Sequence, residues 1–254
     1  MVLQHQELML PQQQELTITR NKKRESALLE QSREWLTREE RSSGIHATEL
    51  LAPRIAYWSR KDPQPLTDRL VTVFLIGKVL HAFVLSAVEG RPLDWKTDEG
   101  SLVSKKLGIS WSPDKLINQK VIELKTTRSW KAPIDYSDLD IYLDQILIYM
   151  AAAETVDAEL WVLYLNLRDE SRRTHPEFRC YNITIPTEGL DAAAKWVVEA
   201  RQSLEQALVS TEQEPWRSLP LCPEFKCGAG NCSWYTRCQP ESRWGTDKFD
   251  KIKD

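Results

Sequence analysis

Two short β-rich runs meet at Asn118 and Gln119, and this feature constrains the fold more than any other in the sequence. A loop of two residues predicts a β-hairpin whose register places Asp114 opposite Glu123. Because side chains alternate between the two faces of a strand, Lys125 lies on the same face as Glu123. Asn tolerates a positive φ but Gln does so poorly, so this is not the ideal turn pair. The hairpin predicts three ionisable groups in one patch.

This patch has a chemical consequence. Two carboxylates that face each other repel and destabilise the hairpin. A divalent cation reverses the sign of that effect, and carboxylate oxygens with water are the ligands that Mg²⁺ prefers. A lysine beside the ion can orient or deprotonate water and balance charge on a phosphate, which indicates metal-assisted phosphodiester hydrolysis. The alternative is that Asp114, Glu123 and Lys125 are ordinary charged positions on an exposed strand.

Two flanking features favour the metal interpretation. Gln145 and Tyr149 are spaced i, i+4 in a helical segment, so their polar tips can emerge together. His81 lies in an otherwise apolar helical segment, one turn after Gly77. A histidine in such a place is usually a hydrogen-bonded core residue, but here it could complete a metal shell. A site that includes an imidazole favours Mn²⁺ more than a site of carboxylates alone does.

The periodicity of apolar residues predicts an α/β or α+β fold around a small mixed sheet. The continuous apolar run from Trp161 to Leu165 indicates a central strand buried on both faces. The predicted helices are 24–41, 48–60, 66–88, 138–154 and 190–209, and the predicted strands are 107–117, 120–127, 159–167 and 178–185.

Charge excludes a protein that grips polyanions by bulk attraction, because 34 Lys and Arg against 37 Asp and Glu give a net charge of −3. Locally the balance differs. Residues 101–135 hold seven basic and three acidic side chains, a local charge of +4 around the predicted patch, which suits a nucleic-acid backbone. Trp111 and Trp130 flank the motif and could stack on unpaired bases.

The sequence favours a cytoplasmic protein without a membrane span. The longest apolar candidate, 71–88, is interrupted by Lys78 and His81. The N-terminal residues lack a basic segment followed by an apolar one, so we expect no secretory signal.

Four of the five cysteines fall within seventeen residues, and this density predicts a metal centre in a reducing compartment. They are Cys222, Cys227, Cys232 and Cys238. Four thiolates suit a [4Fe–4S] cluster or a tetrahedral Zn²⁺ ion, and the absence of a two-residue zinc knuckle favours iron–sulfur. The alternative is four unligated thiols. Cys180 stands apart and reads as a small buried residue in a strand.

The motifs in their order along the chain resemble the RecB-type branch of the PD-(D/E)XK nuclease superfamily, and within it the CRISPR adaptation exonuclease family and its phage-borne relatives. They are Gly77-x3-His81, Pro113-Asp114, Glu123-Leu124-Lys125 and Gln145-x3-Tyr149. The resemblance runs from about residue 44 to residue 238. It implies a restriction-endonuclease-like core, with a mixed central sheet flanked by helices and a Cys-rich metal or iron–sulfur appendage.

The resemblance also implies roles for these residues. Asp114, Glu123 and the Leu124 carbonyl would hold Mg²⁺ or Mn²⁺, with His81 as an additional ligand and Lys125 as the group that activates water. The DNA-positioning residues would be Gln145, Tyr149 and Arg128. A plain core role for Tyr149 stays open.

One departure concerns the cysteines. Cys232-x5-Cys238 resembles the C-terminal end of that family's iron–sulfur site, but the position of its upstream cysteine is Ala52 here. Cys222 offers a replacement thiolate.

We therefore predict a polar, helical extension at 1–43, a nuclease core at 44–210 and a Cys-rich segment at 211–254 that packs on the core. The expected function is that of a Mg²⁺- or Mn²⁺-dependent deoxyribonuclease, exonuclease favoured over endonuclease. Its partner would be DNA, single-stranded ends or flaps above all, with possible protein partners in recombination, repair or CRISPR spacer acquisition. The alternatives are a catalytically silent DNA-binding or adaptor subunit, and a metal-cluster redox sensor.

Overall fold

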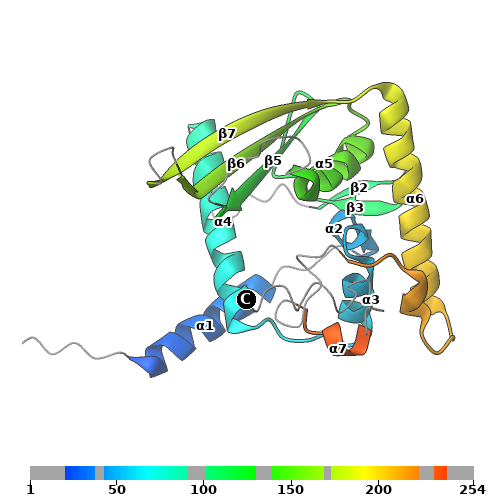
Figure 1. The fold of residues 1–254 in the computed structure, drawn as a ribbon, viewed down its shortest axis with the longest axis horizontal. Coiled ribbons are helices and arrows are strands. Elements are labelled where there is room, and N and C mark those ends of the chain that lie inside the picture. The colour runs from blue at the N-terminus through cyan, green and yellow to red at the C-terminus, as the bar shows by residue number, and fades with distance from the viewer. Residues whose placement is uncertain are drawn as a thin grey trace, which may run out of the picture.

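The computed structural model describes residues 21–37, 43–90, 101–129, 139–168, 173–222 and 232–238, and it contains both helices and strands (Figure 1). The helical elements are α1 (Lys22–Thr37), α2 (Ala47–Leu50), α3 (Pro53–Lys61), α4 (Asp68–Glu89), α5 (Asp140–Ala153), α6 (Thr187–Val209), the 3₁₀ turn η2 (Pro215–Ser218) and α7 (Tyr235–Cys238). The strands are β1 (Ile45–His46), β2 (Leu102–Ser104), β3 (Ile109–Trp111), β4 (Lys115–Ile117), β5 (Lys120–Thr127), β6 (Asp157–Arg168) and β7 (Thr174–Thr184).

The strands form two mixed sheets. The larger sheet has the order β4-β5-β6-β7, in which β5 and β6 are parallel and the two outer pairs are antiparallel. The smaller sheet has the order β1-β3-β2, with β1 parallel to β3 and β2 antiparallel to it. The mixed α/β class is therefore confirmed, whereas the expected single central sheet is divided in two.

The division occurs inside the segment 107–117, which the sequence predicted to be one strand. The structure breaks it into β3 and β4, which belong to different sheets. Pro113 lies in the break, and a proline has no amide hydrogen to donate to a ladder, so it cannot continue a paired strand. The break places Asp114 directly before β4 at the edge of the larger sheet.

Strand β5 separates two layers of side chains because its residues alternate between faces. Val121 packs in the main core, together with α5 and α6. Ile122 and Leu124 point the other way, into a smaller cluster with Leu85 of α4 and Trp161 of β6. Helices α5 and α4 therefore cover opposite faces of the larger sheet, with β5 and β6 between them, as the apolar run in β6 predicted.

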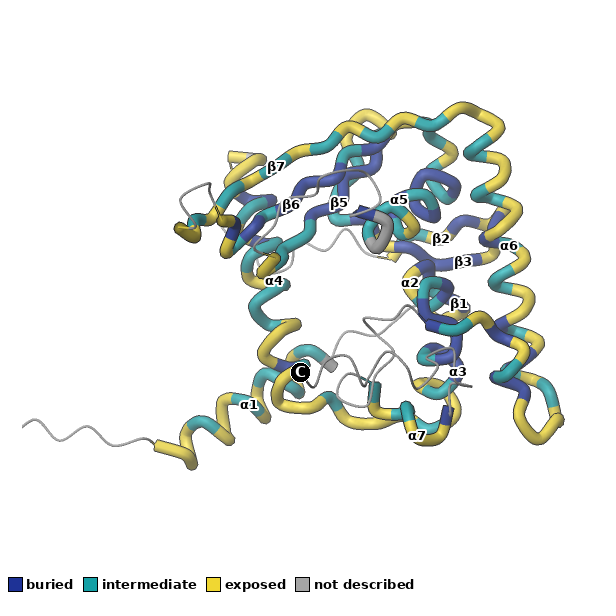
Figure 2. Tube along the Cα trace, in the orientation of Figure 1, coloured by how far each residue is buried: buried dark blue, intermediate teal, exposed yellow. Residues whose placement is uncertain are grey.

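Helix α4 is the longest apolar element. Thr67 caps its start, where the side-chain oxygen accepts the Leu70 amide at 3.3 Å, and Gly90 ends it in the left-handed region at φ 63°. The C-terminal part of α4 packs on β5, and its other end contacts α1 (Figure 1). Much of α4 and of α1 is exposed or half-buried (Figure 2). Within the described residues, α4 has the length and composition of a membrane span, although the sequence argued against one, and 22% of that stretch is buried.

Two further expectations need correction. The predicted helix 48–60 is two helices, α2 and α3, and Pro53 takes the first position of α3, where its missing amide hydrogen costs nothing. Cys180 was expected to be buried, but it is exposed because it lies on the outer strand β7.

Candidate active site

The hairpin has the predicted register. Leu116 pairs with Val121, and Ile117 pairs with Lys120 across the turn. Asn118 and Gln119 both adopt positive φ, 49° and 66°, as a two-residue hairpin turn with the twist of the strands requires. For a residue with a side chain this region costs about 1 kcal/mol or more, so tertiary contacts elsewhere stabilise the turn.

Asp114 joins the hairpin to α4. One carboxylate oxygen, Oδ2, accepts the backbone amide of Leu124 at 2.7 Å. The other, Oδ1, lies 3.1 Å from Nδ1 of His81. His81 and Asp114, which the sequence predicted as ligands of one metal ion, are therefore in direct contact in the structure, and their ligand role stays a prediction.

Glu123 is the most deeply buried carboxylate of the group, with 3% of its surface exposed. Burial, and next the charge of Asp114, raise the pKa of Glu123 to about 7, while Lys125 and His81 oppose the shift. Its oxygen Oε1 accepts hydrogen bonds from Lys125 and, at 2.9 Å, from Nε2 of Gln145. Its oxygen Oε2 is buried and has no hydrogen-bond partner among the described residues.

Lys125 and Gln145 form a closed network with Glu123. The Lys125 ammonium donates to Oε1 of Gln145 at 2.9 Å as well as to Glu123. Burial lowers the pKa of Lys125, but the nearby carboxylates of Glu123 and Asp114 raise it more, so the ammonium stays charged. The Gln145 amide therefore accepts a hydrogen bond from Lys125 and donates one to Glu123, and it also donates to the Tyr149 hydroxyl at 2.8 Å. The i, i+4 pair predicted on this helix therefore does converge.

Tyr149 has a largely structural setting. It is buried, and its ring lies 5.8 Å from that of Trp111. Burial, followed by the charge of Glu123, raises the pKa of Tyr149. Trp111 is itself buried, so the expectation that it stacks on bases is wrong. Trp130 lies outside the described residues.

Other predicted site residues do not join this network. Arg128 follows β5 and is exposed. Leu124 donates its amide to Asp114, and ligation by its carbonyl stays a prediction. The local positive charge is partly used inside the fold, because Lys120 pairs with Glu159 at 3.0 Å and Lys106 with Glu154 at 3.3 Å.

A metal ion at this centre also stays a prediction. Within the described ranges, no group of three or more His, Cys, Asp or Glu side chains is arranged to hold one. The contacts give the reason. Both oxygens of Asp114 already contact protein groups, His81 and the Leu124 amide, and one oxygen of Glu123 accepts hydrogen bonds from Lys125 and Gln145.

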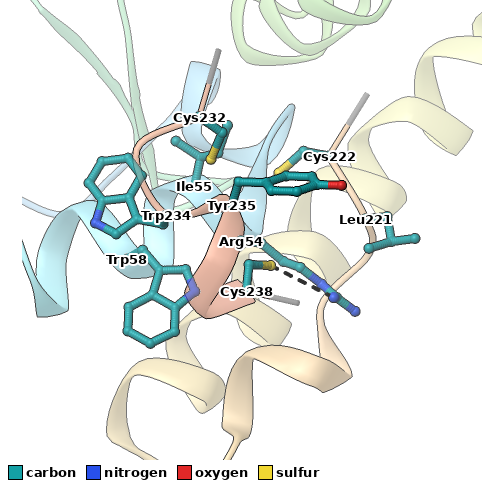
Figure 3. A pocket seen from close by; sticks show the side chains of 9 residues that line it. All are labelled: Arg54, Ile55, Trp58, Leu221, Cys222, Cys232, Trp234, Tyr235 and Cys238. Carbon is teal, nitrogen blue, oxygen red and sulfur yellow. Dashed lines mark hydrogen bonds between the residues drawn. The ribbon is translucent and has the colours of Figure 1, made fainter. Parts of the chain in front are cut away.

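The C-terminal cysteines meet in a second region. Cys222, Cys232 and Cys238 line one small pocket together with Arg54 of α3, and their sulfurs turn toward the same space (Figure 3). The volume of this cavity is about 10 Å³. Cys227, the fourth predicted ligand, lies outside the described residues.

Sequence reasoning missed what Arg54 does. Its guanidinium is buried and donates to the backbone oxygens of Leu219 at 2.9 Å and Arg217 at 3.1 Å, and toward the sulfur of Cys238 at 3.9 Å. One side chain thereby ties α3 to the chain after α6. The available signal was an arginine inside a short apolar helix, Ile55-Ala56-Tyr57, which is a costly place for an unpaired charge.

Comparisons with known proteins add two distant likenesses. No family model matches the sequence, and no curated protein matches it. A solved structure of a protein named SSO0001 is similar over 74% of this chain and 88% of its own, with 19% identity and a TM-score of 0.48. The structure of a phage-related exonuclease from Haemophilus somnus 129PT is similar over 74% of this chain and 83% of its own, with 14% identity and a TM-score of 0.35. Both TM-scores lie below 0.5, so the chemistry of the site has to carry any statement about function.

Proposed function

We propose that this protein is a metal-dependent deoxyribonuclease that hydrolyses phosphodiester bonds in single-stranded ends or flaps. The observation that carries the proposal is the buried oxygen Oε2 of Glu123, which has no partner among the described residues although Asp114, His81 and Lys125 surround the same carboxylate. Leaving such an oxygen unpaired costs about 1–3 kcal/mol, which a fold with no use for it would have no reason to tolerate.

The residues fit a divalent cation. Oxygen donors from Asp114 and Glu123 are those that Mg²⁺ prefers, and an imidazole nitrogen of His81 would suit Mn²⁺ as well. An ion beside Oε2 of Glu123 would relieve both the burial of that charge and its repulsion by Asp114. When bound, the ion would supply Lewis-acid polarisation of the phosphate and a more acidic water molecule.

The chain's own residues then act as follows. The Lys125 ammonium, held between Glu123 and Gln145, orients the attacking water and stabilises negative charge that grows on the phosphate. Water adds to phosphorus and releases a proton to solvent, the bond from phosphorus to the leaving oxygen breaks, and a solvent proton neutralises that oxygen. Because the pKa of Lys125 is raised, its role is that of a fixed positive charge and not of the base. Gln145 keeps the ammonium and the carboxylate in register, and Tyr149 holds Gln145.

Cleavage of end-labelled DNA tests the proposal. Purified protein is incubated with single- and double-stranded substrates in Mg²⁺, in Mn²⁺ and with chelator, and with a circular single strand to separate exonuclease from endonuclease action. We expect cleavage that needs the cation and a free end. Lys125→Ala should abolish it, whereas Lys120→Ala, which removes the same charge from the other end of β5, should leave it intact.

The rival function is a DNA-binding or adaptor subunit without catalysis, and the same experiment decides between them. Tight binding of DNA by the wild-type protein with no cleavage in either cation favours the adaptor and overturns the nuclease proposal. Cleavage at an undiminished rate by Lys125→Ala would also overturn it.

We further propose that Cys222, Cys227, Cys232 and Cys238 hold a structural metal centre, with a [4Fe–4S] cluster and Zn²⁺ as the candidates. Three of these thiols line one pocket beside Arg54, whose guanidinium donates toward the sulfur of Cys238. Burial raises the pKa of the Cys232 thiol, so a bound metal would have to displace its proton. The cavity of about 10 Å³ has room for about one water molecule, so a four-iron cluster needs the thiols to move apart more than a single ion does. Metal analysis distinguishes the two, and a brown protein that absorbs near ~400 nm would identify iron–sulfur.

A further inference from the structure

Helix α4 presents an exposed aromatic ring on the face that carries His81. Phe74 and His81 are seven residues apart, so they lie on one side of the helix at a separation of about 10 Å along its axis. Phe74 is 46% exposed, although burial would stabilise a ring of this size by about 1.5–3 kcal/mol. It lies in the N-terminal half of α4, the half whose residues Asp68 and Lys78 contact α1. A ring in water next to the candidate active site needs an explanation that the fold does not supply.

Gly77 lies between these two residues on the same face. Glycine in the middle of a helix is less favourable than alanine by about 1 kcal/mol. Packing does not require it here, because a Cβ built at Gly77 meets no heavy atom of the described residues within 4 Å. Its backbone is ordinary helix, so no left-handed conformation demands a glycine either. The missing side chain leaves open space on this face between Phe74 and His81, and we call this space the notch.

The charges along this helix complement a polyanion. Its acidic residues, Asp68 and Glu89, stand at its two ends, and the twenty positions between them carry Arg69, Lys78 and His81 but no acid. Asp68 is already paired, since Arg33 of α1 lies 2.6 Å from it. The Lys78 ammonium lies over the Trp35 ring of α1, 5.6 Å from its centroid, which brings a second aromatic residue to this end of the helix.

We propose that the notch at Gly77 binds the unpaired DNA strand that leads to the active site, with one base stacked on Phe74. This inference rests on the proposed function and names how its substrate is held. The backbone of the strand passes Gly77, close to the helix, and its phosphates lie near Lys78, which is four residues after Phe74 and therefore on the same side of α4. About 10 Å corresponds to at most about three nucleotides at the 3.4 Å rise of a stacked strand. A base inside a duplex has both faces covered, so a stacking contact of this kind selects unpaired DNA.

The chain offers a matched control on the same helix. Phe83 is nine residues after Phe74, which places it on the opposite side of α4, and it is more exposed, at 61%. The alternative is that α4 is an apolar surface that contacts another protein, a second copy of this chain or a membrane. In that case the two alanine substitutions should have equal effects on binding, or that at Phe83 should have the larger effect. If the notch holds DNA, Phe74 should matter and Phe83 should not.

The test is binding of a fluorescent single-stranded oligonucleotide, followed by anisotropy with Ca²⁺ in place of the catalytic ion. Phe74→Ala should weaken binding by about 5- to 100-fold, the cost of one lost base stack. Phe74→Leu, which stays apolar but loses the flat ring, should weaken binding similarly. Phe74→Trp, which keeps an aromatic ring, should bind the oligonucleotide as wild type does. Phe83→Ala should stay within about twofold of wild type in affinity and in cleavage.

Gly77→Leu adds a readout that a purely structural role would not move. The side chain has room, and leucine is the better helix former, so the melting temperature should stay equal or rise. Affinity for the single strand should nevertheless fall at least about tenfold, because the notch is filled.

The inference is overturned if Phe74→Ala binds like Phe83→Ala, if Phe74→Leu binds like wild type, or if Gly77→Leu leaves affinity unchanged. It is also overturned if Phe74→Ala changes only sedimentation or binding to phosphatidylcholine vesicles. A wild-type protein that binds but does not cleave refutes the nuclease proposal, whereas one that cleaves while all these variants bind normally refutes the notch and leaves the nuclease standing.

Discussion

The two candidate metal regions of this molecule are built in opposite ways. At the active site, Glu123, Lys125 and Gln145 are hydrogen-bonded to one another, and Asp114 accepts the Leu124 amide and contacts His81. One oxygen of Glu123 has no partner among the described residues. The cysteine pocket is mostly apolar, and Arg54 supplies the hydrogen bonds that close it. A centre that is polar before any ion binds suits a labile, catalytic cation. A pocket of thiols that one arginine ties to the neighbouring backbone suits a structural metal ion.

The largest expected effect is on cleavage at the candidate active site. Asp114→Asn keeps the shape of the side chain but removes the charge that faces Glu123 and His81. We expect cleavage in Mg²⁺ to fall by about 10³-fold or more, the scale seen when a single electrostatic element of a catalytic centre is lost. Affinity for DNA in Ca²⁺ should change by less than about threefold. Rate measurements under single-turnover conditions check this, and a rate within tenfold of wild type would contradict it.

Glu123→Gln should change how stability depends on pH. The pKa of Glu123 is raised to about 7 in the folded protein, so between pH 4.5 and 7 the unfolded state releases its proton first and the folded state loses stability as pH rises. That loss is absent from the variant and amounts to roughly 3 kcal/mol at most. The melting temperature of the variant minus that of wild type, both without metal, should therefore increase by several degrees from pH 5 to pH 8.

Glu159→Gln provides a control of opposite sign in the same sheet. Hydrogen bonds from Trp161 and then Lys120 lower the pKa of Glu159, so its contribution to stability is present at neutral pH and is lost as pH falls. Its removal should cost more at pH 7 than at pH 4, by well under ~1 kcal/mol because the pair is partly exposed. If the two variants showed the same pH trend, the account of Glu123 as a strained buried charge would be wrong.

The cysteine region should respond in stability before activity. Cys232→Ser should lower the melting temperature by several degrees and release metal, while the rate of cleavage at low temperature falls less than tenfold. Arg54→Met should have a comparable effect, because it leaves the oxygens of Leu219 and Arg217 without their donor. An unchanged melting curve for both variants would show that this region does not stabilise the attachment of α3 to the segment that follows α6.

The smallest expected effect is at the turn. Gln119→Gly should raise the free energy of unfolding by about 1 kcal/mol, because glycine adopts the observed φ of 66° without strain. Cleavage should be unaffected. Chemical denaturation measures the change, and a destabilised variant would mean that the turn is not the one described.

The difference between the two regions also explains what the sequence could predict. The hairpin register follows from a two-residue loop and the alternation of side chains, and Gln145 meets Tyr149 because residues four apart on a helix are neighbours, so local rules were enough. The sequence predicted one strand over 107–117 and missed the break at Pro113, and the pairing of β3 with β1 in a separate sheet depends on packing between distant segments. The same holds for Arg54, whose partners lie more than 160 positions away. The burial of Trp111 and the exposure of Cys180 likewise depend on which strands end up outermost.

Titration with Mn²⁺ tests the central claim most directly, namely that the buried carboxylate of Glu123 belongs to a cation site. Calorimetry of the wild-type protein should show one ion bound at the active site, with a melting temperature that rises as the ion is added. In Glu123→Gln that binding and that rise should both disappear. A variant that binds Mn²⁺ as wild type does, or a wild-type protein that binds none while DNA is cleaved, would contradict the account.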